Sequence, residues 1–229
     1  MNCDMIYIEG HIESMKQSTQ GMSSFEIYDG WDVNKYVGVT PENVKSCDEF
    51  NWKIIENSRL HNFKQENENR FLTKLSCVIN HIKFWRRVVD ADETMAFLEH
   101  DAVCTGDWKN PDFDEYLILN IHHAFRPPNK LGLKQFAHVK FSKEKEVQNL
   151  PEDYPLKYYR DNYWKDSFMA PGTGSYAITP KGAKNMLKVA EKSLDQSDFL
   201  LNTYNVNIQY LSPSPVKFNN VNLSTSYGI

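Results

Sequence analysis

Cysteine is scarce in this chain of 229 residues, and long apolar runs are absent from it. The four cysteines lie far apart, and none belongs to a Cys-x-x-Cys pair. This spacing excludes a small disulfide-stapled scaffold and a zinc knuckle, and it is typical of reduced thiols in the cytoplasm. No stretch approaches the roughly 18 consecutive apolar residues of a membrane span. The first residues, MNCDMIYIEGH, have no basic region ahead of an apolar run, so we expect no signal peptide.

The chain also lacks a strong net charge and a biased composition. It has 26 Lys and Arg against 30 Asp and Glu, which gives a net charge of -4. With 24% charged and 13% aromatic residues, this composition excludes a disordered tail and a collagen-like repeat. A chain of this length buries roughly 70% of its unfolded surface, which is enough for a core without staples. We therefore expect residues 1–229 to form a single domain in the cytoplasm.

The apolar pattern predicts strands that alternate with helices. The best helix covers residues 71–89, where apolar residues recur at three- and four-residue steps. Further helices are expected at 180–192, where Pro180 suits the first turn, and at 198–204. Residues 56–70 are polar and poorly patterned, so they predict a surface excursion. Strands are expected at 3–9, 25–28, 94–98, 116–120 and 206–211. This alternation favours an α/β fold with a mostly parallel central sheet flanked by helices.

Two carboxylates, Glu99 and Asp101, follow the expected strand 94–98. In an extended chain side chains alternate, so these two project to the same side. Carboxylates held close together repel each other unless a cation lies between them. Hard oxygen ligands at this position suit Mg²⁺ or Mn²⁺ with a diphosphate completing the shell, and ligands of open α/β sheets bind at the carboxyl ends of strands. The alternative is a solvated acidic turn.

Several segments resemble glycosyltransferase family 25, which includes lipooligosaccharide sugar transferases and collagen galactosyltransferases. The expected helix at 72–85 is followed by FLEHDA at 97–102, which is similar to the family's strand ending in Leu-Glu-Asp-Asp-Ala. Residues 172–183, GTGSYAITPKGA, resemble its Gly-Thr-x-x-Tyr segment, and residues 25–30 and 197–201 resemble two further segments. These segments occur in the family's order. The short, Asn-rich chain fits a phage-encoded member as well as a bacterial one, in the cytoplasm of a bacterium or of a phage-infected host.

The resemblance implies a GT-A-like (Rossmann-like) fold and an inverting glycosyltransferase that uses a nucleotide-sugar donor, typically a UDP-sugar. It also implies a divalent metal, Mn²⁺ or Mg²⁺, held by Asp101 and Glu99. By position Asp198 is the catalytic base or a carboxylate that orients the acceptor, and Asp101 is the second catalytic carboxylate. Asp195 lies three residues from Asp198 and is an alternative. The family's middle Asp is His100 here.

The resemblance also implies a set of donor-binding residues near this motif. His81 stands where the family has the histidine of its Ser-His pair, with Asn80 in place of the serine. Because His81 lies beside the apolar face of its helix, a structural role is the alternative. The expected donor-binding residues are Tyr7, Gly30, His81, Glu99, Thr173, Gly174 and Ser175.

The segment 126–145 is strongly basic, with six Lys and Arg and one Glu, which leaves -9 on the rest of the chain. We interpret it as an acceptor-binding insertion in which Arg126, Lys130 and Lys134 contact the acceptor; a solvated surface is the alternative. A polyanionic acceptor would suit it. Two acceptors are considered, a lipooligosaccharide-type glycan and a hydroxymethylated base in phage DNA.

Two further functional classes stay open at this point. One is a metal-dependent hydrolase built on His100, Asp101, His122 and His123. The other is a non-catalytic nucleic-acid-binding module centred on residues 126–145, whose DNA binding would weaken steeply with salt.

Overall fold

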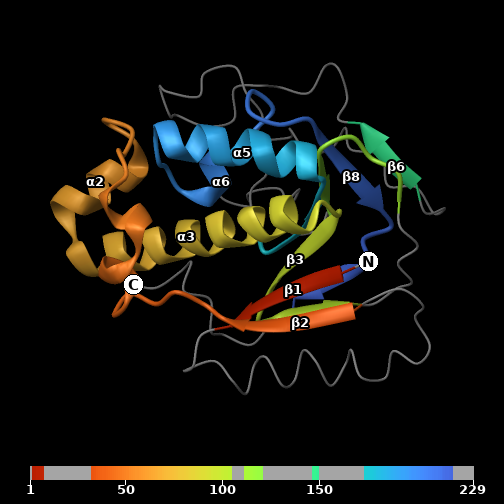
Figure 1. Cartoon of the computed structure of the whole chain (residues 1–229), viewed down its shortest axis with the longest axis horizontal. Helices are drawn as coiled ribbons and strands as arrows, with labels where there is room; N and C mark the ends of the chain where they lie inside the picture. The colour runs from red at the N-terminus through yellow and green to blue at the C-terminus, as the bar shows by residue number, and fades with distance from the viewer. Residues whose placement is uncertain (1, 8–31, 105–110, 121–145, 150–172, 219–229) are drawn as a thin grey trace, which may run out of the picture.

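A seven-stranded sheet forms the centre of the computed structural model, which describes residues 2–7, 32–104, 111–120, 146–149 and 173–218 (Figure 1). The strand order is β2-β1-β3-β7-β5-β8-β6. A separate pair, β4 (Ala102–Cys104) and β9 (Val216–Phe218), forms a two-stranded antiparallel sheet. The seven strands of the large sheet are β1 (Asn2–Tyr7), β2 (Asp32–Val37), β3 (Met95–Glu99), β5 (Tyr116–Ile118), β6 (Glu146–Asn149), β7 (Ser175–Ile178) and β8 (Ile208–Ser212).

The directions of these strands confirm the prediction of a mostly parallel sheet. β1 is parallel to β2 and to β3, and β5 is parallel to β8. β7 is antiparallel to both β3 and β5, and β6 is antiparallel to β8. β2, β1, β3, β5 and β8 therefore share one direction, and β7 and β6 run against it. As a result, the carboxyl ends of β1 and β3 and the start of β7 lie at the same edge of the sheet.

Two long helices cover one face of the sheet, α3 (Glu68–Ala91) and α5 (Pro180–Lys192) (Figure 1). Both have capped starts, because Asn67 accepts a hydrogen bond from the Arg70 N–H at 2.9 Å and the Thr179 hydroxyl accepts one from the Gly182 N–H at 3.2 Å. A Cβ at Gly182 would lie 2.6 Å from the Glu115 carbonyl oxygen, so glycine lets α5 approach the chain before β5 closely.

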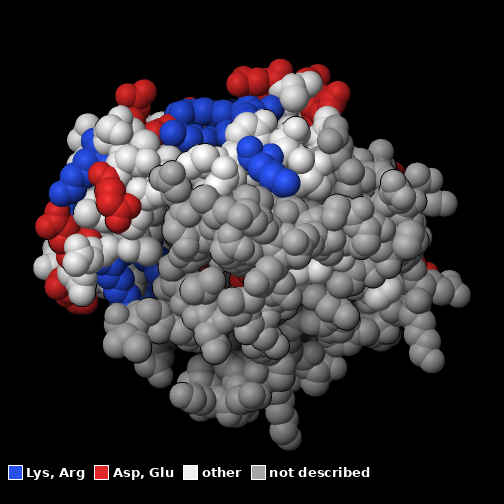
Figure 2. All heavy atoms as spheres, turned by 90° about the horizontal axis from the view of Figure 1, so that it is seen from below, with Lys and Arg blue, Asp and Glu red and all other residues white. Residues whose placement is uncertain are grey.

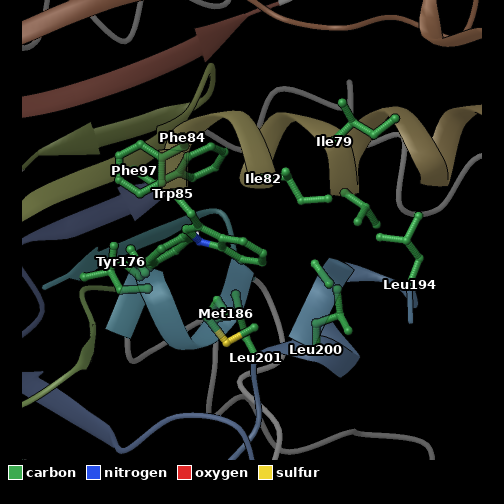
Figure 3. Close-up of a cluster of buried hydrophobic side chains, with 14 of the residues drawn as sticks. Ile79, Ile82, Phe84, Trp85, Phe97, Tyr176, Met186, Leu194, Leu200 and Leu201 are labelled. Atoms are coloured by element: carbon green, nitrogen blue, oxygen red, sulfur yellow. Dashed lines mark hydrogen bonds between the residues drawn. The ribbon is translucent and has the colours of Figure 1, made fainter. Parts of the chain in front are cut away.

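The main hydrophobic core lies between these helices and the sheet (Figure 3). Ile79, Ile82 and Trp85 of α3 are fully buried, as are Tyr176 of β7 and Met186 of α5. These α3 positions follow the three- and four-residue spacing of the expected helix 71–89, which is confirmed. A second, smaller apolar cluster on the opposite face includes Cys3, Met5, Ala96, Leu98, Leu117 and Leu211.

The expected surface excursion at residues 56–70 is wrong. This segment contains α2 (Arg59–Glu66) and the first turn of α3. Leu60 is fully buried and Phe63 is 7% exposed, and the Ser58 hydroxyl caps α2 by accepting a hydrogen bond from the His61 N–H at 3.1 Å. With two apolar anchors three residues apart, α2 can dock on the core although its remaining positions are polar.

Other elements differ from the expectation mainly at their bounds. The helix expected at 198–204 is the single turn α6 (Ser197–Leu200). The strand expected at 25–28 lies outside the described residues, whereas β2, β4, β6, β7 and β9 were not predicted as strands. In the parts of the chain that the structure describes, no helix is long and apolar enough to cross a membrane. The assignment of residues 1–229 to one domain stays a prediction.

Candidate active site

The carboxyl end of β3 meets the start of β7 at one edge of the sheet. Leu98 pairs with Ser175, and the Glu99 N–H donates a hydrogen bond to the Gly174 carbonyl at 2.8 Å. On the other side of β3, Ile6 of β1 pairs with Glu99, so Tyr7 follows at the same edge. The structure therefore brings together Tyr7, Glu99, Gly174 and Ser175, as the sequence predicted for a site at this edge.

Glu99 and Asp101 are close to each other through a turn and not through strand alternation. β3 ends at Glu99, His100 and Asp101 form the turn, and β4 begins at Ala102. The premise that residues 99–101 are extended is therefore wrong, because the chain reverses there to enter the two-stranded sheet. The proximity itself holds, since the charge of Asp101 contributes to the raised pKa of Glu99.

Glu99 is the most strongly perturbed carboxyl group of the site. Although its side chain has an exposed surface, the surrounding protein withdraws the carboxylate from water. This withdrawal, followed by repulsion from Asp101 and then from Asp198, raises the pKa of Glu99 to about 8, with Lys74 acting in the opposite direction. The repulsion of Glu99 by Asp101 and Asp198 is the contribution to the raised pKa that a bound cation would reverse.

Two polar atoms at this edge are buried without a hydrogen-bond partner among the described residues, Asp101 Oδ1 and Ser175 Oγ. Asp101 is half-buried, and burial raises its pKa, whereas Ser175 is fully buried. Unpartnered buried oxygens are rare in folded proteins, and at a site edge they are suited to an external ligand. An unpartnered carboxylate oxygen beside a second carboxylate is a hard-oxygen set of the kind that Mg²⁺ and Mn²⁺ prefer.

Asp198 enters the site from the first turn of α6. Its Oδ1 accepts hydrogen bonds from the Thr173 N–H at 3.3 Å and from the Thr173 hydroxyl at 3.0 Å. Asp198 is half-buried, and its charge raises the pKa of Glu99, so Asp198 lies near Glu99. The alternative residue, Asp195, is fully buried and accepts a hydrogen bond from the Gln196 N–H at 2.7 Å. The accessible carboxylate of this pair is therefore Asp198.

His81 lies behind Thr173, inside the protein. Its side chain is 2% exposed, and its ring stacks on Phe97 with centroids 4.3 Å apart. Nδ1 is 2.8 Å from the Tyr176 hydroxyl, and Nε2 is 3.4 Å from Thr173 Oγ1. Burial lowers the pKa of His81 to about 3, so the ring is neutral. In this position the imidazole reaches the site through Thr173, and a direct contact with the donor stays a prediction.

The neighbouring Asn80 serves the fold. Its side chain accepts a hydrogen bond from the Val39 N–H at 2.7 Å and donates one to the Val39 carbonyl at 3.1 Å. It thus holds the chain that follows β2 against α3. The amide side chain satisfies both backbone groups of Val39, which a serine hydroxyl at this position is too short to do.

The sequence reasoning missed two neighbours of the site on α3. The charge of Lys74 lowers the pKa of Glu99. The pKa of Cys77 is raised to about 11, first by burial and then by the charge of Glu99. Lys74, Cys77 and His81 are spaced by three and four residues, which puts them on one helix face. This spacing was visible in the sequence, and it marks the side of α3 that faces the carboxyl end of β3.

Several predicted residues lie outside the described residues: Gly30, His122, His123, Arg126, Lys130, Lys134 and the rest of the basic segment 126–145. Their roles stay predictions. On the part of the surface that is described, Lys and Arg side chains are flanked by Asp and Glu side chains (Figure 2). Lys181 on α5, for example, lies 2.8 Å from Asp114. In the described ranges, no group of three or more His, Cys, Asp or Glu side chains could hold a metal ion by itself.

Comparison with known proteins gives one family. The model of glycosyltransferase family 25, described as LPS biosynthesis protein, matches residues 11–201. No curated relative matches the chain. Among solved structures, the galactosyltransferase LgtC in complex with donor and acceptor sugar analogs is 11% identical, with a TM-score of 0.45, over 92% of this chain and 73% of LgtC. An active-site mutant of LgtC is 12% identical, with a TM-score of 0.42, over 92% of this chain and 72% of that one. The family match covers most of the chain, which therefore belongs to glycosyltransferase family 25 and is a nucleotide-sugar-dependent glycosyltransferase.

Proposed function

We propose that this protein transfers a sugar from a UDP-sugar to an acceptor hydroxyl with inversion at the anomeric carbon. The observation that carries the proposal is the convergence of Glu99, Asp101 and Asp198 at one edge of the sheet, with the buried Asp101 Oδ1 lacking a partner among the described residues. Lys74 offsets only part of the repulsion of Glu99 by Asp101 and Asp198, so a ligand that compensates the remaining negative charge is favoured. A divalent cation with a nucleotide diphosphate supplies that compensation.

Glu99 and Asp101 are the residues that would hold the cation, Mn²⁺ or Mg²⁺. Two carboxylates suit such ions, which commonly bind one or two protein carboxylates together with substrate phosphates. When bound there, the cation would supply positive charge against the leaving diphosphate. Ser175 Oγ, buried and unpartnered in the adjacent strand, is available to a hydroxyl or phosphate group of the donor.

Asp198 is the proposed base. Because both hydrogen bonds from Thr173 go to Oδ1, the orientation of the carboxylate is fixed and Oδ2 is the oxygen available to an acceptor. The acceptor O–H proton passes to Asp198, the acceptor oxygen forms a bond to the anomeric carbon, and the bond from that carbon to the diphosphate oxygen breaks with its electron pair leaving on UDP. A single displacement of this kind inverts the configuration.

The proposed acceptor is a lipooligosaccharide-type glycan, in line with the description of the family. A hydroxymethylated base in phage DNA is the second acceptor to test, because the segment 126–145 carries +5 and a DNA acceptor is a polyanion. Membership of a glycosyltransferase family favours sugar transfer over hydrolysis and over non-catalytic nucleic-acid binding. We place the reaction in the cytoplasm.

A thermal-shift titration with UDP, with and without Mn²⁺ and with other nucleoside diphosphates as controls, tests donor binding. At about 100 times its dissociation constant UDP stabilises the folded protein by about 2.7 kcal/mol, which for this size raises Tm by roughly 5–10 °C. We expect a UDP-selective shift that requires Mn²⁺ and disappears in Asp101→Asn. Asp92→Asn is the matched control, because Asp92 is 81% exposed and its φ of 51° is tolerated by Asn. A shift that ignores the metal, or no shift with any nucleotide, would contradict the proposal.

A further inference from the structure

A continuous row of hydrogen bonds runs from the core to Asp198. The Trp85 Nε1–H lies 3.0 Å from the Tyr176 hydroxyl oxygen, which lies 2.8 Å from His81 Nδ1. On the other side of the ring, His81 Nε2 lies 3.4 Å from Thr173 Oγ1, whose hydroxyl donates to Asp198 at 3.0 Å. Trp85 and Tyr176 are fully buried and lie together in the core (Figure 3). The row thus joins α3, β7, the residue before Gly174 and α6.

The positions of the protons in this row follow from its two ends. An indole N–H can only donate, so the Tyr176 oxygen accepts from Trp85. A carboxylate can only accept, so the Thr173 hydroxyl proton points to Asp198. Tyr176 then gives its own proton to His81 Nδ1, and the neutral ring carries its proton on Nε2, where it donates to Thr173 Oγ1. Every donor in the row has an acceptor.

The other neutral tautomer leaves groups unsatisfied. With the proton on Nδ1, the Tyr176 oxygen would accept from both Trp85 and His81, and its hydroxyl proton would need another acceptor in a fully buried place. Nε2 would face Thr173 Oγ1 without a proton between them, because the Thr173 proton is held by Asp198. A buried polar group without its partner costs about 1–3 kcal/mol, so the Nε2–H tautomer is favoured.

We propose that His81, fixed as the Nε2–H tautomer by Tyr176, is a positioning residue that holds the Thr173 hydroxyl on Asp198 Oδ1 and thereby aims Oδ2 at the acceptor. This rests on the proposed role of Asp198 as the base. Besides Asp198, the Thr173 hydroxyl has two neighbours, His81 Nε2 at 3.4 Å and Ser197 Oγ at 3.3 Å. Without the imidazole, only Ser197 is left beside Asp198. The lowered pKa of His81, about 3, agrees with a ring that stays neutral through the working range of the enzyme.

The first test is the tautomer itself, which needs no substrate. Long-range ¹⁵N–¹H NMR of the histidine rings separates the two neutral tautomers, and loss of one signal set in His81→Gln assigns His81 among the seven histidines. We expect the Nε2–H pattern, unchanged between pH 8 and pH 5. An Nδ1–H pattern, or protonation of this ring near pH 6.5, would overturn the proposal.

The second test is kinetic. His81→Phe keeps a ring against Phe97 and removes both nitrogens, whereas His81→Gln keeps a donor that can reach Thr173. We expect kcat to fall about 10- to 100-fold in His81→Phe, with the KM of the donor changing much less, and His81→Gln to restore most of the loss. Thr173→Val should match His81→Phe, and Thr173→Ser, which keeps the hydroxyl on Asp198, should lose less kcat than Thr173→Val.

Tyr176→Phe removes the hydroxyl that fixes the His81 tautomer, so its kcat should fall as well, and Tyr210→Phe is its matched control. This substitution removes a tyrosine hydroxyl on β8, away from the hydrogen-bond row, that donates to Gln148 Oε1 of β6 at 2.7 Å. Equal losses in His81→Phe and His81→Gln, or losses that follow only the fall in Tm, would show a structural role and overturn the positioning role. Absence of transfer activity in the wild-type protein would contradict the proposed function. The NMR pattern would still decide whether the hydrogen-bond row exists as described.

Discussion

The carboxylates of Asp4 on β1 and Glu99 on β3 lie on neighbouring strands but have opposite electrostatic surroundings. Asp4 of β1 is fully buried, and its Oδ2 lies 2.6 Å from Nε of Arg87 on α3. Glu99, on the adjacent strand β3, faces Asp101 and Asp198, and no described Lys or Arg lies within ion-pair distance of it. Asp4 has its counter-ion within the protein, whereas Glu99 and Asp101 have none among the described residues. Under the proposed function, the difference separates a charge that serves folding from charges that bind a ligand.

The largest expected effect is on turnover, in Asp101→Asn. The substitution keeps the volume of the side chain and removes the charge that would bind the cation, so kcat should fall by about 10²–10³-fold or more. The measurement is sugar transfer from the UDP-sugar that gives activity in the wild type. Asp92→Asn should leave kcat unchanged. Retained activity in Asp101→Asn, with an unchanged Tm, would contradict the assignment of Asp101.

For the Asp4–Arg87 pair we expect an effect on the stability of the fold instead of on turnover. Arg87→Ala leaves a fully buried carboxylate without its counter-ion and removes the guanidinium from the ring of Tyr36, 4.2 Å from its centroid. The free energy of unfolding should fall by about 3–5 kcal/mol, measured by urea denaturation. Lys45→Ala, which breaks the pair with Glu68 between 54% and 69% exposed side chains, should cost no more than about 1 kcal/mol. Similar losses in both variants would contradict the comparison.

A third prediction concerns the pH dependence at Glu99. Because its pKa is raised to about 8, a proton competes with the cation below that pH. Mn²⁺ affinity, measured by calorimetry without donor, should therefore fall by about tenfold for each pH unit below 8, with a proton released on binding. In Glu99→Gln this dependence should flatten. An affinity that is constant between pH 6.5 and 8.5 in the wild type would contradict the raised pKa.

The same shift sets the sign of the effect on stability without a metal. The folded state holds the Glu99 proton up to about pH 8, whereas the unfolded chain releases it near the ordinary pKa of 4.5. Folding therefore takes up a proton between these values, and the contribution of Glu99 to the free energy of unfolding falls as the pH rises from 4.5 to 8. Mn²⁺ at saturating concentration should remove this loss.

The smallest expected effect is at Lys74, whose charge opposes the shift of Glu99. Lys74→Met removes that charge, so the pKa of Glu99 should rise by a few tenths of a unit, as expected for a partly solvated charge in a high effective dielectric. The pH midpoint of Mn²⁺ binding should move upward by the same amount. Lys83→Met is the control on the same helix, because Lys83 is exposed and does not act on Glu99. A lower pH midpoint of Mn²⁺ binding in Lys74→Met would contradict the placement of Lys74 near Glu99.

Much of the framework could be read from local patterns. The spacing of apolar residues in α3 and the proline at the start of α5 gave both helices, and the apolar run before Glu99 gave β3. α2 was missed because two buried residues among polar ones produce a weak periodicity. β2 was missed because a mostly exposed edge strand is fixed by its pairing with β1 and not by its own pattern.

By itself, the sequence determined the family, the main helices and the pair Glu99 and Asp101, because these depend on residues close together in the chain. The tertiary structure alone decided that the pair is joined by a turn, that Asp195 is buried whereas Asp198 is partly exposed, and that His81 lies behind Thr173. Thr173 and Asp198 are 25 residues apart, and His81 and Thr173 are 92 apart. Contacts over such separations follow from the packing of α3 and α6 against the edge of the sheet, where β7 begins, which no local pattern encodes.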